Sequence, residues 1–248
     1  MSIVENIFET PHDAPPEWAL MLTAYIDESS HETGTVVLGG FIGNKEQWET
    51  FLPQWRKGLG KRTRLHTKEL RWNKPATKSL LTRLAPIPFD CGLRPIYASV
   101  TDSDYSDLLE NDLEKWVHKT YIVAALPMML LAINSIPADE TIKFVFDQQL
   151  QYENMVKIMH LFLQKHKTPS GEAKLTSIEY VFQSPLTEPG DYLAYAITQV
   201  CRNMNSRKAD LCAPIALQLM MPHVSPIVCK PTREEIRYVV ECGKNYIK

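Results

Sequence analysis

Two short apolar runs that each end in an aspartate limit what this chain can fold into. Met21–Ile26 leads directly into Asp27, and Ile142–Phe146 leads directly into Asp147. Both runs are typical of buried strands. A carboxylate at the end of such a strand is costly to desolvate unless it is paired or bound to a metal. Taken singly, an aspartate after a strand is more often a turn residue than a catalytic one. Taken together, they indicate a cluster of carboxylates at one edge of a sheet.

The composition is that of an ordinary soluble globular protein, with 248 residues, 44% hydrophobic and 23% charged. We see no repeat or flexible linker and expect one domain over 1–248, with a loose arm at 1–17 and a C-terminal extension at 205–248. Five scattered cysteines without a CxxC pair argue against a disulfide framework or zinc site and favour a reducing compartment. The longest apolar run, 121–133, is too short to span a bilayer. We therefore expect a cytoplasmic protein without a membrane partner.

The order of the hydrophobic patterns predicts an α/β fold. Three successive strands, expected to pair antiparallel, are followed by alternating helices and strands. This order predicts a mixed five-stranded sheet flanked by helices, with a helical insertion at 44–90 between the second and third strands. The first and fourth strands can then lie side by side, which would make Asp27 and Asp147 neighbours. The expected strands cover about 21–26, 35–42, 96–100, 142–146 and 176–182.

The insertion carries an unusual concentration of positive charge. Ten Lys or Arg residues and one acid, Glu69, lie between Arg56 and Arg83, although the whole chain has a net charge of −2. A local basic field of this kind would steer a polyanion and contact its phosphates. A solvated helical face with one packing tryptophan explains the segment equally well. The candidate nucleic-acid-binding residues are Lys61, Arg62, Arg64, Lys68, Arg71, Trp72, which could stack on a base, and Lys74.

Further titratable residues are candidates for the same site. His66 and Glu69 are three residues apart and would be neighbours on a helix, where His66 could transfer a proton. A surface His–Glu pair is the alternative. Asp191 opens a later helix, where the helix dipole alone would favour an acid. Glu28 would point to the opposite strand face from Asp27 unless the chain turns there. No glycine-rich phosphate loop, GxSxG or HExxH motif occurs, which argues against P-loop NTPases, serine hydrolases and zinc peptidases.

Several of these segments together resemble the DUF3800 family, whose members are thought to have a ribonuclease H-like fold. The similar segments are Tyr25–Ser29, Val37–Gly40, Trp48 and Trp55, His66–Leu70, Phe144–Asp147 and Gly190–Tyr195. The resemblance implies that five acids gather around one or two divalent ions, Mg²⁺ or Mn²⁺, with His66 nearby. Those acids are Asp27, Glu28, Glu69, Asp147 and Asp191.

The sequence thus leads to a hypothesis of a divalent-metal-dependent nuclease that hydrolyses the phosphodiester bonds of nucleic acid. The expected metal ligands are Asp27, Asp147, Asp191 and Glu69, while Glu28 supports the site and His66 assists proton transfer. Carboxylates from separate elements suit such chemistry because one residue cannot hold two ions. Two alternatives stay open. One is a non-catalytic nucleic-acid-binding module, and the other is a scaffold within a mobile-element or defence complex.

Overall fold

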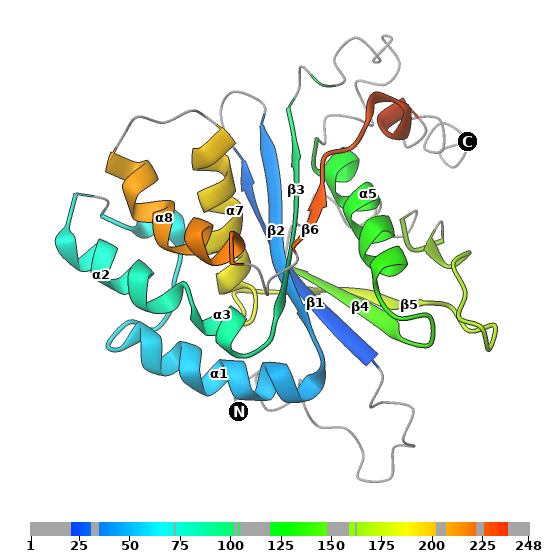
Figure 1. The fold of residues 1–248 in the computed structure, drawn as a ribbon, viewed down its shortest axis with the longest axis horizontal. Coiled ribbons are helices and arrows are strands. Elements are labelled where there is room, and N and C mark those ends of the chain that lie inside the picture. The colour runs from blue at the N-terminus through cyan, green and yellow to red at the C-terminus, as the bar shows by residue number, and fades with distance from the viewer. Residues whose placement is uncertain are drawn as a thin grey trace.

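A mixed sheet of six strands, in the order β5-β4-β1-β2-β3-β6, forms the centre of the computed structural model (Figure 1). The structure describes residues 21–30, 35–71, 73–101, 104, 120–147, 159–161, 163–201, 207–221 and 226–237. The predicted arm at residues 1–17, Trp72 and parts of the predicted C-terminal extension at 205–248 lie outside these. The strands are β1 (Met21–Ser30), β2 (Val36–Gly43), β3 (Arg94–Val100), β4 (Thr141–Asp147), β5 (Leu175–Val181) and β6 (Ile227–Cys229).

The strand pairing follows the predicted order. β2 pairs antiparallel with both β1 and β3, while β4 lies parallel to β1 and β5 lies parallel to β4. The predicted strand count of five is wrong, because β6 adds a short parallel strand beside β3. This strand comes from the region that we had interpreted as a C-terminal extension. The prediction that the first and fourth strands are neighbours is confirmed.

Helices cover both faces of the sheet, as Figure 1 shows. One face carries α1 (Lys45–Leu59), α2 (Pro75–Leu84), α3 (Ile87–Asp90), α7 (Glu188–Cys201) and α8 (Arg207–Leu219), and the other carries α5 (Thr120–Ser135). Consecutive residues of β1, Ala24, Tyr25 and Ile26, are therefore all buried, alternately in one core layer and the other. A sheet covered on both faces favours such continuous apolar strands. No helix among the described residues has both the length and the apolar character to cross a bilayer.

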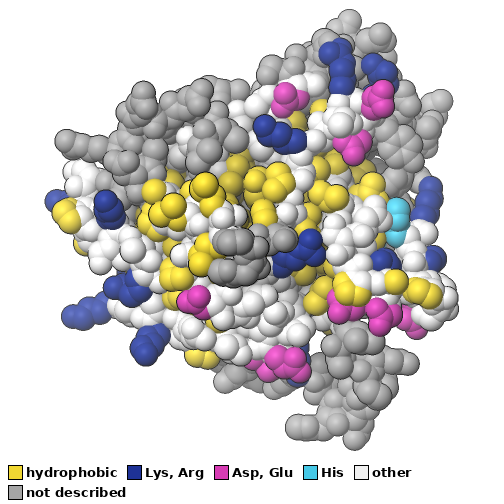
Figure 2. All heavy atoms as spheres, in the orientation of Figure 1, with side chains coloured by type: hydrophobic (Ala, Val, Ile, Leu, Met, Phe, Trp, Pro, Cys, Tyr) yellow, Lys and Arg dark blue, Asp and Glu magenta, His cyan; other side chains and the backbone are white. Residues whose placement is uncertain are grey.

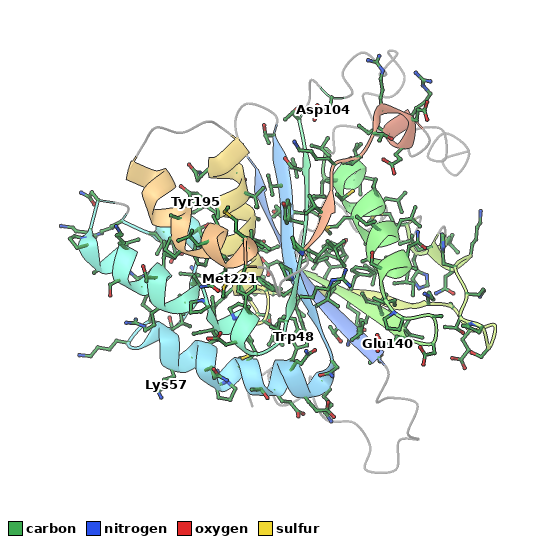
Figure 3. The ribbon with its side chains drawn as sticks, in the orientation of Figure 1. Trp48, Lys57, Asp104, Glu140, Tyr195 and Met221 are labelled. Atoms are coloured by element: carbon green, nitrogen blue, oxygen red, sulfur yellow. The ribbon has the colours of Figure 1, made fainter. Side chains whose placement is uncertain are left out.

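The helical insertion lies between β2 and β3, as predicted, and comprises α1, the 3-10 helix η3 (Thr67–Glu69), α2 and α3. The α1 helix begins at a capping box, in which the Gln47 amide N–H donates to Asn44 Oδ1 at 2.9 Å and the Asn44 N–H donates to Gln47 Oε1 at 2.8 Å. Trp48 of this helix points to the sheet, where its Nε1 donates to the Thr23 carbonyl at 3.0 Å, whereas Lys57 extends into solvent (Figure 3).

Two glycines allow α7 to approach the sheet closely. A Cβ on Gly39 of β2 would lie 2.6 Å from the backbone nitrogen of Ala194 in α7. A Cβ on Gly190 would lie 2.7 Å from the Gly39 carbonyl oxygen and 3.1 Å from the Asp27 nitrogen. Real side chains essentially never approach so closely, so a larger residue at either position would push α7 outward. The absence of a side chain at these two positions therefore lets α7 lie close to β2 and to Asp27 of β1.

Candidate carboxylate site

Four carboxylates line a cavity of about 150 Å³ where β1, β4 and α7 meet. Asp27 lies in β1 and Asp147 is the last residue of β4, while Glu188 and Asp191 lie in the first turn of α7. The loop Arg64–His66 and the turn that follows β5, with Phe182–Ser184 and Thr187, complete the lining. We call this the carboxylate cavity. It brings Asp27 of β1 together with acids of β4 and α7 that lie more than a hundred residues later in the sequence.

Asp27 lies at the centre of this negative charge. The last residues paired between β1 and β4 are Ile26 and Phe146, so Asp27 and Asp147 follow them on adjacent strands. Burial, as the largest cause, and the charges of Asp191, Glu28 and Asp147 together raise the pKa of Asp27 to about 9, against one hydrogen bond that it accepts from the Glu28 N–H. In such surroundings the ionised carboxylate is unfavourable unless it binds a proton or a cation.

Asp191 is 4% exposed and is held by the loop that precedes α2. Its Oδ2 accepts the Thr67 N–H at 2.7 Å, and its Oδ1 accepts the Thr67 hydroxyl at 2.5 Å. The ring nitrogen Nδ1 of His66 lies 3.3 Å from Asp191 Oδ2, and this hydrogen bond raises the pKa of His66. The structure thus brings His66 to the carboxylate cavity, with its side chain 39% exposed. The hydrogen bonds of Thr67 fix η3 against the first turn of α7.

Glu188 was missed in the sequence analysis. It is 7% exposed, and its Oε2 accepts a hydrogen bond from the Trp55 indole Nε1 at 2.7 Å. Burial, as the largest cause, and the charge of Asp191 raise the pKa of Glu188 to about 7, against the lowering effect of the hydrogen bonds from Trp55 and the Leu65 backbone and of the charge of Arg64. A carboxyl with a pKa near neutral is suited to acid–base work.

Two of the predicted site acids do not line the cavity. Glu69 forms an ion pair with Arg64 and is exposed. Glu28 follows Asp27 on β1, and its charge contributes to the raised pKa of Asp27. Neither is among the residues that line the carboxylate cavity. Glu188 thus lies in the cavity, where we had expected Glu69.

One cation lines the carboxylate cavity, and exposed cations flank that residue in sequence. Arg64 lines it and is half-buried, and the remaining described members of the predicted basic set are exposed: Lys61, Arg62, Lys68, Arg71 and Lys74. Figure 2 shows Lys and Arg side chains projecting along the margin of the molecule that α1 and α2 occupy. A polyanion approaching the cavity from this side would meet positive charge before it met the carboxylates.

The donor set fits a hard divalent cation in its chemistry. Carboxylate oxygens are the ligands that Mg²⁺ and Ca²⁺ prefer, and a cation would relieve the repulsion that raises the pKa of Asp27. Within the described residues, no three or more His, Cys, Asp or Glu side chains already surround one point. An ion would therefore have to draw Asp27, Asp147, Glu188 and Asp191 inward by side-chain rotation.

We compared the chain with known proteins. No family model matches the sequence, and no curated protein matches it. Among solved structures, the chain is similar to one from the PCNA:RNase HII complex of Archaeoglobus fulgidus, with 12% identity and a TM-score of 0.39. That similarity covers 86% of this chain and 99% of the other. A likeness at this identity and TM-score is too distant to indicate a function.

Proposed function

We propose that the protein is a divalent-metal-dependent nuclease that hydrolyses phosphodiester bonds, with a ribonuclease H-like fold and membership of the DUF3800 family. The observation that carries this proposal is the convergence of four carboxylates from β1, β4 and α7 on one cavity, where burial and the charges of neighbouring acids raise the pKa of Asp27 to about 9. Strongly shifted pKa values of this kind are found preferentially at functional sites. The three antiparallel strands, with β4 and β5 parallel beside β1, agree with the proposed fold.

We assign different roles in this reaction to the residues of the carboxylate cavity. Asp27, Asp147, Asp191 and Glu188 would hold one or two Mg²⁺ or Mn²⁺ ions, which would stabilise the charge that develops on the phosphate. In this role the Nδ1–H of His66 would donate to the Asp191 carboxylate, so Nε2 is the nitrogen available to give a proton to the leaving oxygen. The hydrogen bond to Asp191 raises the pKa of His66, which favours its protonated form.

A cleavage assay tests this proposal. Single- and double-stranded DNA and RNA oligonucleotides are incubated with the protein in EDTA, Mg²⁺ or Mn²⁺. We expect cleavage with metal and none in EDTA, and we expect Asp27→Asn and Asp147→Asn to abolish it. Asp139→Asn is the matched control, because Asp139 is exposed in the turn before β4, at the strand end away from the cavity. Unchanged cleavage in both cavity variants would show that the site is wrongly assigned.

The exposed cations beside the cavity also favour a second candidate, a nucleic-acid-binding module that does not cut. This candidate predicts salt-dependent binding that persists in Asp27→Asn and no metal-dependent cleavage by the unaltered protein. The two candidates therefore give opposite results in the same assay. A scaffold role in a mobile-element or defence complex is a prediction from the resemblance alone.

A further inference from the structure

Phe182 stands at the rim of the carboxylate cavity with 66% of its surface exposed. It directly follows β5, whose last residue, Val181, pairs with Asp147. Other large exposed hydrophobic residues, such as Leu217 and Met220, lie in or next to α8 and do not line this cavity. An aromatic ring has a large apolar area, so leaving it in water is unfavourable compared with covering it. The residues that line the cavity beside Phe182 are mostly polar or charged, so packing within the protein does not explain an exposed aromatic ring at this position.

The turn that presents Phe182 is fixed on both sides. The next residue, Gln183, has a φ of 50°, which side-chain-bearing residues adopt infrequently, and its N–H donates to Asp147 Oδ1 at 3.1 Å. Ser184 is buried, and its carbonyl accepts hydrogen bonds from the Thr187 N–H at 3.1 Å and the Thr187 hydroxyl at 2.9 Å. The turn therefore connects β5, the Asp147 carboxylate and the start of α7. The backbone on either side of Phe182 is therefore held at the cavity that this residue lines.

The size of the cavity decides what can lie against this ring. About 150 Å³ is well below the ~300–1,000 Å³ that enclose a small ligand. A phosphate can enter such a space, but the base attached to the same nucleotide must remain outside, at the rim. In a duplex both faces of a base are covered by its stacked neighbours, so only an unpaired, unstacked base can offer a face to Phe182. Aromatic side chains bind such bases without sequence preference.

We propose that Phe182 is a stacking platform for one unpaired nucleobase and that the substrate is single-stranded nucleic acid. This inference rests on the proposed nuclease function and specifies its substrate class. Arg64 lines the same cavity, and Lys61, Arg62 and Lys68, close to it in sequence, are exposed, so these cations are available to the backbone phosphates that flank the stacked base.

The test measures binding without cleavage. Fluorescence anisotropy is recorded with a labelled single-stranded oligonucleotide, with the same sequence as a blunt duplex, and with an abasic strand of equal length. All proteins carry Asp27→Asn to prevent cutting. The second substitutions are Phe182→Ala, Phe182→Tyr, which keeps an aromatic ring, and Leu217→Ala, a control residue of similar exposure at 63%.

We expect Phe182→Ala to weaken single-strand binding by about 5- to 150-fold, the range for loss of one base–aromatic stack. Phe182→Tyr and Leu217→Ala should bind like the parent, and the abasic strand should bind equally to the parent and to Phe182→Ala. The unfolding temperature should be the same for all, because both altered side chains are exposed.

Three results would overturn the inference: no single-strand binding by the parent, no loss with Phe182→Ala, or an equal loss on duplex and abasic strand. Failure of this inference can be told apart from failure of the nuclease proposal. If the protein cleaves in a metal-dependent way but binds equally well with Phe182→Ala, the stacking platform is wrong and the nuclease proposal stands. If binding depends on Phe182 but the unaltered protein does not cleave, the nuclease proposal is wrong and the stacking platform stands.

Discussion

Asp27→Asn should make the metal-free protein more stable, and the gain should grow with pH. Burial and three neighbouring acids raise the pKa of Asp27 from 3.8 to about 9. A carboxyl whose folded-state pKa lies above its unfolded value stabilises the fold fully below pH 4 and loses this contribution as pH rises towards 9. Each pH unit in that window costs about 1.4 kcal/mol. Between pH 4 and pH 8 the loss is on the order of 5 kcal/mol, and the neutral asparagine avoids it.

Urea unfolding in EDTA at pH 5, 6.5 and 8 measures this effect as the difference between Asp27→Asn and the unaltered protein. The difference isolates Asp27, because other titrating groups act on both proteins. We expect it to be small at pH 5 and to reach several kcal/mol at pH 8. Asp139→Asn serves as the control and should show no growth with pH. A difference that is the same at pH 5 and pH 8 would refute the conclusion that Asp27 is forced to bind a proton in the folded state.

Three further substitutions test the surroundings of the site. Trp55→Phe removes the indole donor to Glu188, so the pKa of Glu188 should rise above about 7 and unfolding should become easier by about 1–3 kcal/mol in urea titrations above neutral pH. Gly190→Ala places a Cβ 2.7 Å from a carbonyl oxygen of β2, so it should cost about 1–3 kcal/mol in the same assay and reduce cleavage by displacing α7. Lys61→Glu with Arg64→Glu should weaken nucleic-acid binding and lower the slope of log affinity against log salt by about 2; an unchanged slope would show that these cations contact no phosphate.

The part of the site that sequence could predict depends on strand order. Asp27 and Asp147 each end a buried apolar run, and the order of the patterns makes β1 and β4 neighbours. That pair follows from local patterns and from the rules of sheet topology. Asp191 was recognisable as a first-turn acid of α7, and its pairing with His66 agrees with their proposed shared role.

The remaining features depend on contacts that no local pattern encodes. Glu188 precedes Pro189 and has the appearance of a turn residue, and its hydrogen-bond donor in the folded protein is Trp55, 133 residues away in sequence. A signal did exist, since a buried tryptophan on an apolar helix stripe needs an acceptor for its N–H. Thr67 gave no comparable signal. The strand β6 escaped prediction because three residues are too few to show a hydrophobic period.

Thermal unfolding with Mn²⁺ tests the central claim, that the carboxylate cavity is a divalent cation site, most directly. A ligand that binds only the native state stabilises it by mass action, by about 2.7 kcal/mol at a hundred times its dissociation constant. Melting temperatures are measured in EDTA and in increasing Mn²⁺ for the unaltered protein, Asp27→Asn and Asp139→Asn. We predict a concentration-dependent rise in the unaltered protein and in Asp139→Asn that is absent from Asp27→Asn. No rise at millimolar Mn²⁺, or an equal rise in Asp27→Asn, would contradict the assignment.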